Sequence, residues 1–344
     1  MNLARVLVSC FGTNDNMWYG RFSRIEIGVD ARGSPPTDPG AVCCGRIFRR
    51  GGSRVTTKVL RSWFTDRSRP HVIALGNQKG GVGKSTTAIH LVIGLTRLGF
   101  DVGSIDLDER QGTLSRFMRN RQRFATASGV DLPIPDNQGL YRSIHDTTSK
   151  AGEDEIARLA RVLERFRHKS FVVIDIAGDN TFLSRCGHIL ADTLITPLND
   201  SFLDLDALVR IDIDGQRIIG PSAYSVMVTD GSARRAAFGG GTPDWIVMRN
   251  RLSQIDSRNK QQMRALLETL APRIGFRLAP GLSERVIYRQ LFTSGLTVLD
   301  IDDPAIGFDC KPRHRAAARE IDDLLRTVGI PEPAAAEDAD RQIA

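Results

Sequence analysis

Lysines and glycines at residues 79–86, in the order Lys-Gly-Gly-Val-Gly-Lys-Ser-Thr, constrain the chemistry of this chain more tightly than any other segment. Glycine lets several backbone amides converge on an anion, because no Cβ blocks the approach. A lysine such as Lys84 can neutralise the β- and γ-phosphates, and a hydroxyl such as that of Ser85 can ligate Mg²⁺. The segment therefore predicts a phosphate-binding loop. Its predicted contacts are Gly80, Gly81, Val82, Gly83, Lys84, Ser85 and Thr86.

The elements on either side of this segment are those that a phosphate loop needs. An apolar run at residues 71–76 predicts a buried strand, and apolar periodicity from Thr87 predicts a helix near residues 84–98. The amino terminus of that helix adds unpaired N–H groups and partial positive charge. A glycine-rich turn with incidental lysines is the plainer alternative, but the strand, the spacing and the helix start all favour the loop.

One position departs from the ordinary pattern Gly-x-x-x-x-Gly-Lys-Ser/Thr. The first glycine is replaced by Gln78, and a second lysine, Lys79, follows it. This arrangement resembles the deviant Walker A motif of the ParA/MinD family of dimerising ATPases. The resemblance implies ATP and Mg²⁺ as cofactors and an ATP-dependent homodimer. It also implies a catalytic role for Lys79, which in that family reaches across the dimer to the partner's nucleotide.

Carboxylates follow two other apolar runs. The run at residues 102–107 predicts a strand that leads into Asp106 and Asp108, and the run at residues 170–175 predicts a strand that ends in Asp175. Side chains two apart on a strand share a face, and parallel strands end at one edge, so we expect these groups near the phosphates. By the resemblance, Asp106 supports the Mg²⁺ shell, Asp108 positions the attacking water, and Asp175 holds the metal through water. For each aspartate alone, a solvated or capping role is the alternative.

The segment after Asp175 departs from the family. The family usually carries Thr-Pro-Gly there, whereas this chain has Ile176, Ala177 and Gly178. Gly178 can still donate its amide to the γ-phosphate, but the missing proline removes a fixed φ from the switch. We expect a slow, Mg²⁺-dependent ATP hydrolase that acts as a switch. A nucleotide-dependent protein scaffold with negligible hydrolysis is the alternative.

Three further segments are less generic than the phosphate loop and restrict the resemblance to one subfamily. They are residues 196–202, 244–251 and 280–289. Together with the phosphate loop they resemble the MipZ subfamily, which positions the division plane in alphaproteobacteria. This resemblance implies control of division-site placement by inhibition of FtsZ assembly, coordinated with a ParB-like protein and nonspecific DNA. It also implies that Asn250 reads the adenine edge, since an amide can donate and accept; a turn or cap role is the alternative. A ParA-type partition ATPase would share every phosphate-site residue and is the rival function.

The net charge of +7 belongs to residues 1–70. They hold 12 Lys/Arg against 5 Asp/Glu, which leaves 35 of the 47 basic and 35 of the 40 acidic residues for the rest of the chain. Residues 1–70 are rich in Arg, Gly and Ser without periodicity, so we expect a disordered leader. It is either an arginine-rich arm for an anionic partner or untranslated upstream sequence, and we favour the second. The ATPase domain is expected at residues 71–330 and a disordered acidic, proline-containing tail at residues 331–344.

A local basic excess inside the domain predicts a DNA-binding surface. Residues 245–290 hold nine Lys/Arg against three acidic residues, as in an electrostatic phosphate footprint. An ordinary solvated helix face is the alternative. The candidate contacts are Arg258, Lys260, Arg264, Arg285 and Arg289.

The alternation of the remaining segments predicts an α/β fold, a doubly wound and mostly parallel sheet flanked by helices. Strands are expected at residues 71–76, 102–107, 170–175, 192–196, 244–249 and 276–279. Helices are expected at residues 84–98, 153–168, 181–190, 258–273, 284–292 and 313–328. The five cysteines lack metal-ligand spacing, and no apolar run is long enough to span a membrane. We expect a cytoplasmic protein with nucleoid association as an option.

Overall fold

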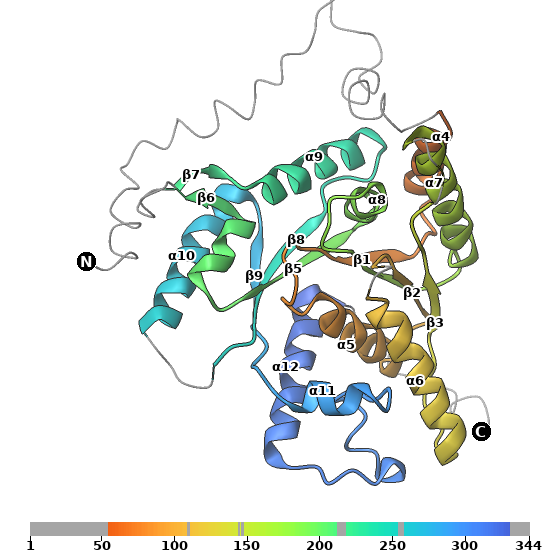
Figure 1. Ribbon diagram of the computed structural model, residues 1–344, viewed down its shortest axis with the longest axis vertical. Helices are drawn as coiled ribbons and strands as arrows, with labels where there is room; N and C mark the ends of the chain where they lie inside the picture. The colour runs from red at the N-terminus through yellow and green to blue at the C-terminus, as the bar shows by residue number, and fades with distance from the viewer. Residues whose placement is uncertain are drawn as a thin grey trace, which may run out of the picture.

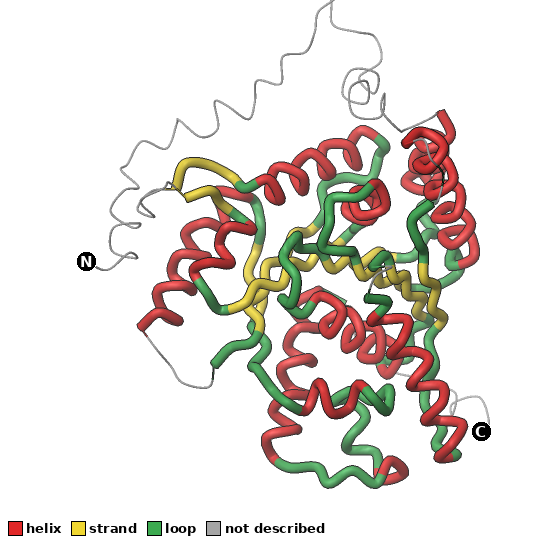
Figure 2. The backbone as a smooth tube through the Cα atoms, viewed as in Figure 1, coloured by secondary structure: helices red, strands yellow, loops and turns green. Residues whose placement is uncertain are grey.

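A parallel sheet forms the centre of the molecule (Figures 1 and 2). The computed structural model describes residues 54–108, 111–143, 145, 148–211, 218–253 and 258–330, so the predicted tail and most of the predicted leader lie outside it. Seven strands pair in the order β3-β2-β4-β1-β5-β8-β9, and every pairing is parallel. These strands are β1 (His71–Leu75), β2 (Val102–Asp106), β3 (Asp136–Gly139), β4 (Phe171–Asp175), β5 (Thr193–Asn199), β8 (Asp244–Asn250) and β9 (Arg277–Ala279).

The central strands are buried because helices cover both of their faces. All five residues of β2 and of β4 are buried. Along β1, Val72 and Ala74 belong to one hydrophobic cluster, and Ile73 and Leu75 belong to the other. The period of two along a strand thus separates two cores, one on each side of the sheet.

Two layers of helices enclose the sheet (Figure 1). The hydrophobic cluster on one face includes residues of α4 (Arg54–Thr65), α7 (Thr148–Arg165), α8 (Phe182–Leu190), α9 (Ala223–Ala237) and α10 (Arg258–Ile274). The cluster on the opposite face includes residues of α5 (Lys84–Arg97), α6 (Thr113–Ser128), α11 (Ile287–Phe292) and α12 (Pro312–Val328). This three-layer architecture is the predicted doubly wound fold, and the fold prediction is confirmed.

Helix α4 corrects the prediction that residues 1–70 lack regular structure. Its Leu60, Trp63 and Phe64 are buried in the same core as α7. The chain that follows is also anchored, because Arg69 donates two hydrogen bonds, of 2.6 and 2.7 Å, to the Asp192 carboxylate. The prediction was wrong here because a single apolar stripe in a basic, polar segment gave too weak a signal.

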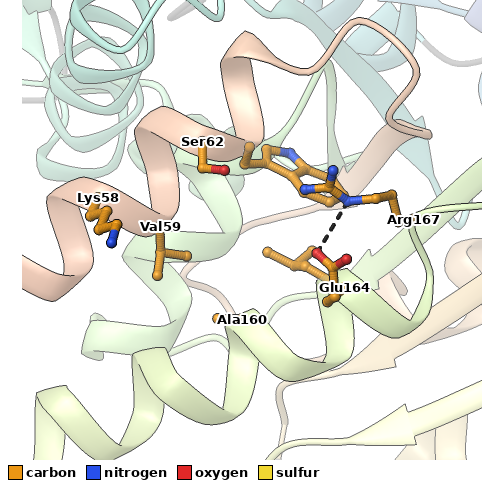
Figure 3. A pocket seen from close by; sticks show the side chains of 8 residues that line it. Lys58, Val59, Ser62, Ala160, Glu164 and Arg167 are labelled. Atoms are coloured by element: carbon orange, nitrogen blue, oxygen red, sulfur yellow. Dashed lines mark ion pairs between the residues drawn. The ribbon is translucent and has the colours of Figure 1, made fainter.

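A pocket of about 230 Å³ lies between α4 and α7 (Figure 3). Lys58 and Ser62 of α4 face Ala160 and Glu164 of α7 across it. Arg167, just beyond α7, closes one end through a 3.1 Å ion pair between its Nε and Glu164 Oε2. The groove shows that α4 packs along α7 without filling the whole interface.

The other elements not predicted from the sequence are α6, α9, β3 and a small hairpin. That hairpin pairs β6 (Val209–Ile211) with β7 (Ile218–Pro221) in antiparallel fashion and follows a 3-10 helix, η2 (Phe202–Ala207). A second 3-10 helix, η3 (Pro304–Ile306), precedes α12. The strands predicted nearest the nucleotide loop, at residues 71–76, 102–107 and 170–175, are present with shifts of one residue.

Candidate nucleotide-binding site

The predicted phosphate loop joins the end of β1 to the start of α5. Gly81 and Gly83 have φ values of 72° and 89°, in the left-handed region that favours glycine. A Cβ on Gly83 would lie 2.0 Å from the Asn250 side-chain nitrogen, so glycine is also required there by close packing. Gly83 caps α5 without a side-chain hydrogen bond, which leaves the first amides of the helix available to an anion.

Asn77 fixes the entrance to the loop, a role that was not predicted from the sequence. Its Nδ2 donates to the Pro197 carbonyl at 2.7 Å, and its Oδ1 accepts from the Lys79 amide at 2.8 Å. The side chain is 1% exposed. Its only signal in the sequence was an amide directly after a buried strand, and the partner strand lies 120 residues away.

Lys84 lies at the floor of the site and is buried. Its Nζ donates to the Lys79 carbonyl at 3.0 Å. Burial lowers the pKa of Lys84, and the carboxylates of Asp175 and Asp108 oppose that shift. A Cβ on Gly178 would lie 3.4 Å from the same Nζ, so the segment after β4 passes directly beside the lysine.

Asp106 and Asp175 end neighbouring strands and are paired in register. Asp106 Oδ1 accepts from the Asp108 amide at 3.0 Å, and Oδ2 accepts from the Ser115 amide at 2.9 Å, in the first turn of α6. Burial raises the pKa of Asp106 despite these bonds. Because β2 ends at Asp106, the prediction that Asp106 and Asp108 share a strand face was wrong. Asp106 instead stabilises the turn that carries Asp108, because its carboxylate accepts the Asp108 amide.

Asp175 is the least compensated charge in the site. It is 1% exposed, and among the described residues neither carboxylate oxygen has a hydrogen-bond partner of normal geometry. Burial, followed by the Asp106 carboxylate, raises the pKa of Asp175 to about 7, while the Ser85 hydroxyl and the Lys84 ammonium act in the opposite direction. Such a group fits a cation, because a buried carboxylate without a partner is costly.

These residues fit Mg²⁺. Within the described part of the chain, no group of three His, Cys, Asp or Glu side chains gathers around a possible metal position. Mg²⁺ does not require one, since it keeps several waters and binds one or two protein oxygens together with substrate phosphates. The Ser85 hydroxyl and the Asp175 carboxylate would hold the ion, which would supply positive charge at the phosphates. The role of Asp106 would be indirect because both of its oxygens accept backbone amides.

Replacing Asp175 with asparagine is expected to stabilise the nucleotide-free protein above pH 7. The carboxyl ionises near 3.8 when unfolded and near 7 when folded, so the folded protein retains a proton between these values. The stability of the wild type therefore falls as pH rises from 3.8 to about 7, and the full cost of the buried charge remains above that range.

Thermal unfolding at pH 8 should show a melting temperature for the asparagine variant that is higher than that of the wild type by about 2–4 °C or more. The gain should shrink at pH 5, and Mg²⁺-ATP should stabilise the variant less than the wild type. An equal gain at both pH values would contradict the raised pKa.

Asp108 lies just beyond β2, beside a pocket of about 180 Å³. Its Oδ1 accepts from the Gln111 amide at 3.2 Å. Gly178 lines the same pocket, so Asp108 faces the segment that passes Lys84. The predicted site residues Lys84, Asp108 and Gly178 are therefore brought together, although the water-positioning role of Asp108 stays a prediction.

Lys79, the residue that marks the deviant loop, is held within its own chain. Its Nζ lies 3.2 Å from Asp204 Oδ1 and also donates to the Leu203 carbonyl. Both partners belong to η2. The ammonium must leave this contact before it can reach a nucleotide on another chain.

Asn250 supports the phosphate loop. Its Nδ2 donates to the Val82 carbonyl at 2.7 Å, and its Oδ1 accepts from the Arg251 amide at 2.8 Å. The side chain is 8% exposed. Contact with the adenine edge stays a prediction, and it would require Asn250 to change one of these bonds.

The predicted DNA contacts are divided between the two layers. Helix α10 contributes Arg258, Lys260 and Arg264 on one face of the sheet, and α11 contributes Arg289 on the other (Figure 1). Arg285 forms an ion pair with Glu320, in which Arg285 Nη2 lies 2.6 Å from Glu320 Oε1. The set therefore does not share one helix face, and DNA contact by these residues stays a prediction.

A parallel sheet whose central strand leads through a phosphate loop into a helix, with a buried carboxylate at the end of the neighbouring strand, defines a P-loop nucleotide-binding protein. The chain belongs to the ATPase MipZ family, whose sequence profile matches residues 71–332. In the part of the chain that the structure describes, no helix has the length and apolar character needed to cross a membrane.

Two known proteins are similar in sequence to part of this chain. Chromosome partitioning protein ParA of Caulobacter vibrioides (strain NA1000 / CB15N) is 31% identical over 170 residues, which are 43% of this chain and 63% of that protein. Protein IncC of Escherichia coli is 31% identical over 166 residues, 42% of this chain and 44% of that protein. The chain thus matches less than two thirds of either relative.

A solved structure shares the fold. The McdA(D38A)-ATP complex of Cyanothece superposes with a TM-score of 0.51 and 18% identity. The superposition covers 77% of this chain and 98% of that chain. At this level of identity the likeness concerns the fold alone.

Proposed function

We propose that this chain is an Mg²⁺-dependent ATP hydrolase that dimerises on ATP and regulates the placement of the division site. The observation that carries the proposal is the buried Asp175 carboxylate, which has no hydrogen-bond partner of normal geometry among the described residues and lies beside Ser85 and Lys84 in a glycine-formed anion site. A metal-bound triphosphate supplies both the cation that Asp175 lacks and the anion that the loop can bind.

The proposed outputs follow the family. The dimer would act on an FtsZ-like protein to inhibit its assembly and would be coordinated with chromosome segregation through a ParB-like partner. Membership of the ATPase MipZ family supports this assignment. The alternative is a ParA-type partition ATPase, which is supported by the 31% identity to a chromosome partitioning protein.

Slow hydrolysis is part of the proposal. Ile176 and Ala177 follow Asp175, so no proline fixes the backbone of the segment that carries Gly178. Gly178 nevertheless lies close to Lys84. A chain that binds ATP and dimerises but turns it over negligibly would favour the scaffold alternative.

Nonspecific DNA binding is the remaining element of the proposal. Arg258 and Arg289 are exposed, whereas Arg264 is paired with Glu268 at 2.9 Å. A single chain thus offers few unengaged cations from the predicted set. Dimerisation would double them, and each neutralised phosphate contributes a slope of about −0.9 in log affinity against log salt.

The test of this function is light scattering coupled to size-exclusion chromatography of the full chain. The nucleotide-free protein and the ADP complex should elute as monomers, and a slowly hydrolysed ATP analogue with Mg²⁺ should yield dimers. Random duplex DNA should co-elute with the dimer and not with the monomer. A monomer in every condition would contradict the switch, and a dimer that ignores DNA would remove only the DNA element.

A further inference from the structure

Arg142 lies at the pocket that Asp108 and Gly178 line. The other residues around this pocket of about 180 Å³ are Leu107, Gln111, Ala177, Asp179, Thr181 and Leu183. Among the described residues that line it, Arg142 is the only cation, and Asp108 and Asp179 are the carboxylates. A cation at this position can act on whatever anion enters the pocket.

The segment that carries Arg142 is tied to the site. It follows β3, and the Leu140 amide donates to the Asp106 carbonyl at 2.9 Å. Asp106 in turn holds the Asp108 amide. The base of the Arg142 segment is therefore positioned by the same strand end that positions the predicted catalytic aspartate.

The Arg142 guanidinium forms an exposed ion pair with Asp179, a carboxylate that would compete with a phosphate for it only weakly. Arg142 Nη2 lies 2.6 Å from Asp179 Oδ2, and the two side chains are 50% and 48% exposed. Ion pairs this exposed contribute little, because water and salt screen them. A phosphate carries more charge and accepts two parallel N–H bonds from an arginine, so it can displace the carboxylate.

Gly178 connects this pocket to the phosphate loop. The position of a Cβ on Gly178 is 3.4 Å from Lys84 Nζ, and Gly178 also lines the pocket. We infer that Arg142 leaves Asp179 when ATP is bound and contacts the terminal phosphate from the side opposite Lys84. The inference rests on the proposed ATP hydrolysis and adds a catalytic residue to it. The arginine supplies positive charge to the phosphoryl oxygens and transfers no proton.

The test compares the affinity of the full chain for ADP and for a slowly hydrolysed ATP analogue, together with single-turnover hydrolysis. Arg142→Ala should weaken analogue binding about tenfold and hydrolysis by about 10- to 100-fold, while ADP affinity is unchanged. Arg142→Lys should recover part of both, because it keeps charge but loses the two-bond geometry. Asp179→Asn should strengthen analogue binding slightly, since it removes the charge that competes with the phosphate for Arg142.

Arg185→Ala provides the matched control. Arg185 is a nearby arginine on α8 that donates to Asn180 Oδ1 at 3.1 Å and does not line the pocket. It should leave both affinities and turnover unchanged. Equal losses of ADP and analogue affinity in Arg142→Ala, or no loss at all, would overturn the inference. A wild-type chain that neither binds nor hydrolyses ATP would instead overturn the proposed function.

Discussion

Replacing Lys79 with alanine is expected to leave the folded chain monomeric in saturating ATP, whereas the wild type forms dimers. Two nucleotides that face each other repel through their phosphates, and an ammonium from each partner offsets that repulsion. Light scattering in the slowly hydrolysed analogue measures the dimer fraction directly. Nucleotide affinity of the monomer should change little, because Lys79 Nζ contacts η2 and not the loop of its own chain. A variant that still dimerises fully would remove the family role of Lys79.

The intramolecular contact of Lys79 predicts a second variant with the opposite effect. Asp204→Asn removes the charge that holds Lys79 Nζ at 3.2 Å, so less free energy is lost when the lysine leaves. Since Lys79 is partly exposed, the gain in dimerisation should be modest, about two- to fivefold in the dissociation constant. Asp206→Asn is the control, because Asp206 lies in the same 3-10 helix and is exposed. Equal effects of the two substitutions would indicate net charge as the cause.

The parts of the fold that the sequence predicted share one physical origin. Strands β1 and β4 are buried on both faces of a parallel sheet, so they appear in the sequence as continuous apolar runs. The phosphate loop was recognisable because its geometry requires glycine at residues 81 and 83, whose φ values are positive. Asp175 was found because a strand end is easily located once the strand is known. Local constraints of this kind act on residues that are neighbours in the chain.

The parts that the sequence did not predict depend on distant partners. Strand β3 has the sequence Asp-Asn-Gln-Gly and pairs with β2 at the sheet edge, where the Ser104 hydroxyl donates to the Asp136 carbonyl at 3.1 Å. Helix α6 carries many charged and polar residues and few buried ones, which obscures its periodicity. The contact of Lys79 with Asp204 likewise joins two separate parts of the chain. No local pattern carries such information.

Replacing Asp108 with alanine is expected to reduce ATP turnover by about 100-fold or more, while nucleotide binding is preserved. Asp108 lines the pocket beside Gly178 and contributes to the electrostatic environment of Lys84. We therefore expect its carboxylate to orient a water for attack on the terminal phosphate. Because hydrolysis would then lag behind binding, the variant should accumulate as the ATP-bound dimer. Steady-state phosphate release and light scattering in ATP together measure both effects.

Asp108→Asn separates the catalytic role from a structural one. Asparagine keeps an oxygen that can accept the Gln111 amide, now 3.2 Å from Asp108 Oδ1, but it lacks the negative charge that orients water. If the charge is catalytic, the asparagine variant should lose as much turnover as the alanine variant. Wild-type turnover in the asparagine variant alone would make Asp108 a turn-capping residue. Unchanged turnover in both would leave the attacking water to another group, and Asp106 is poorly suited because both of its oxygens already accept backbone amides.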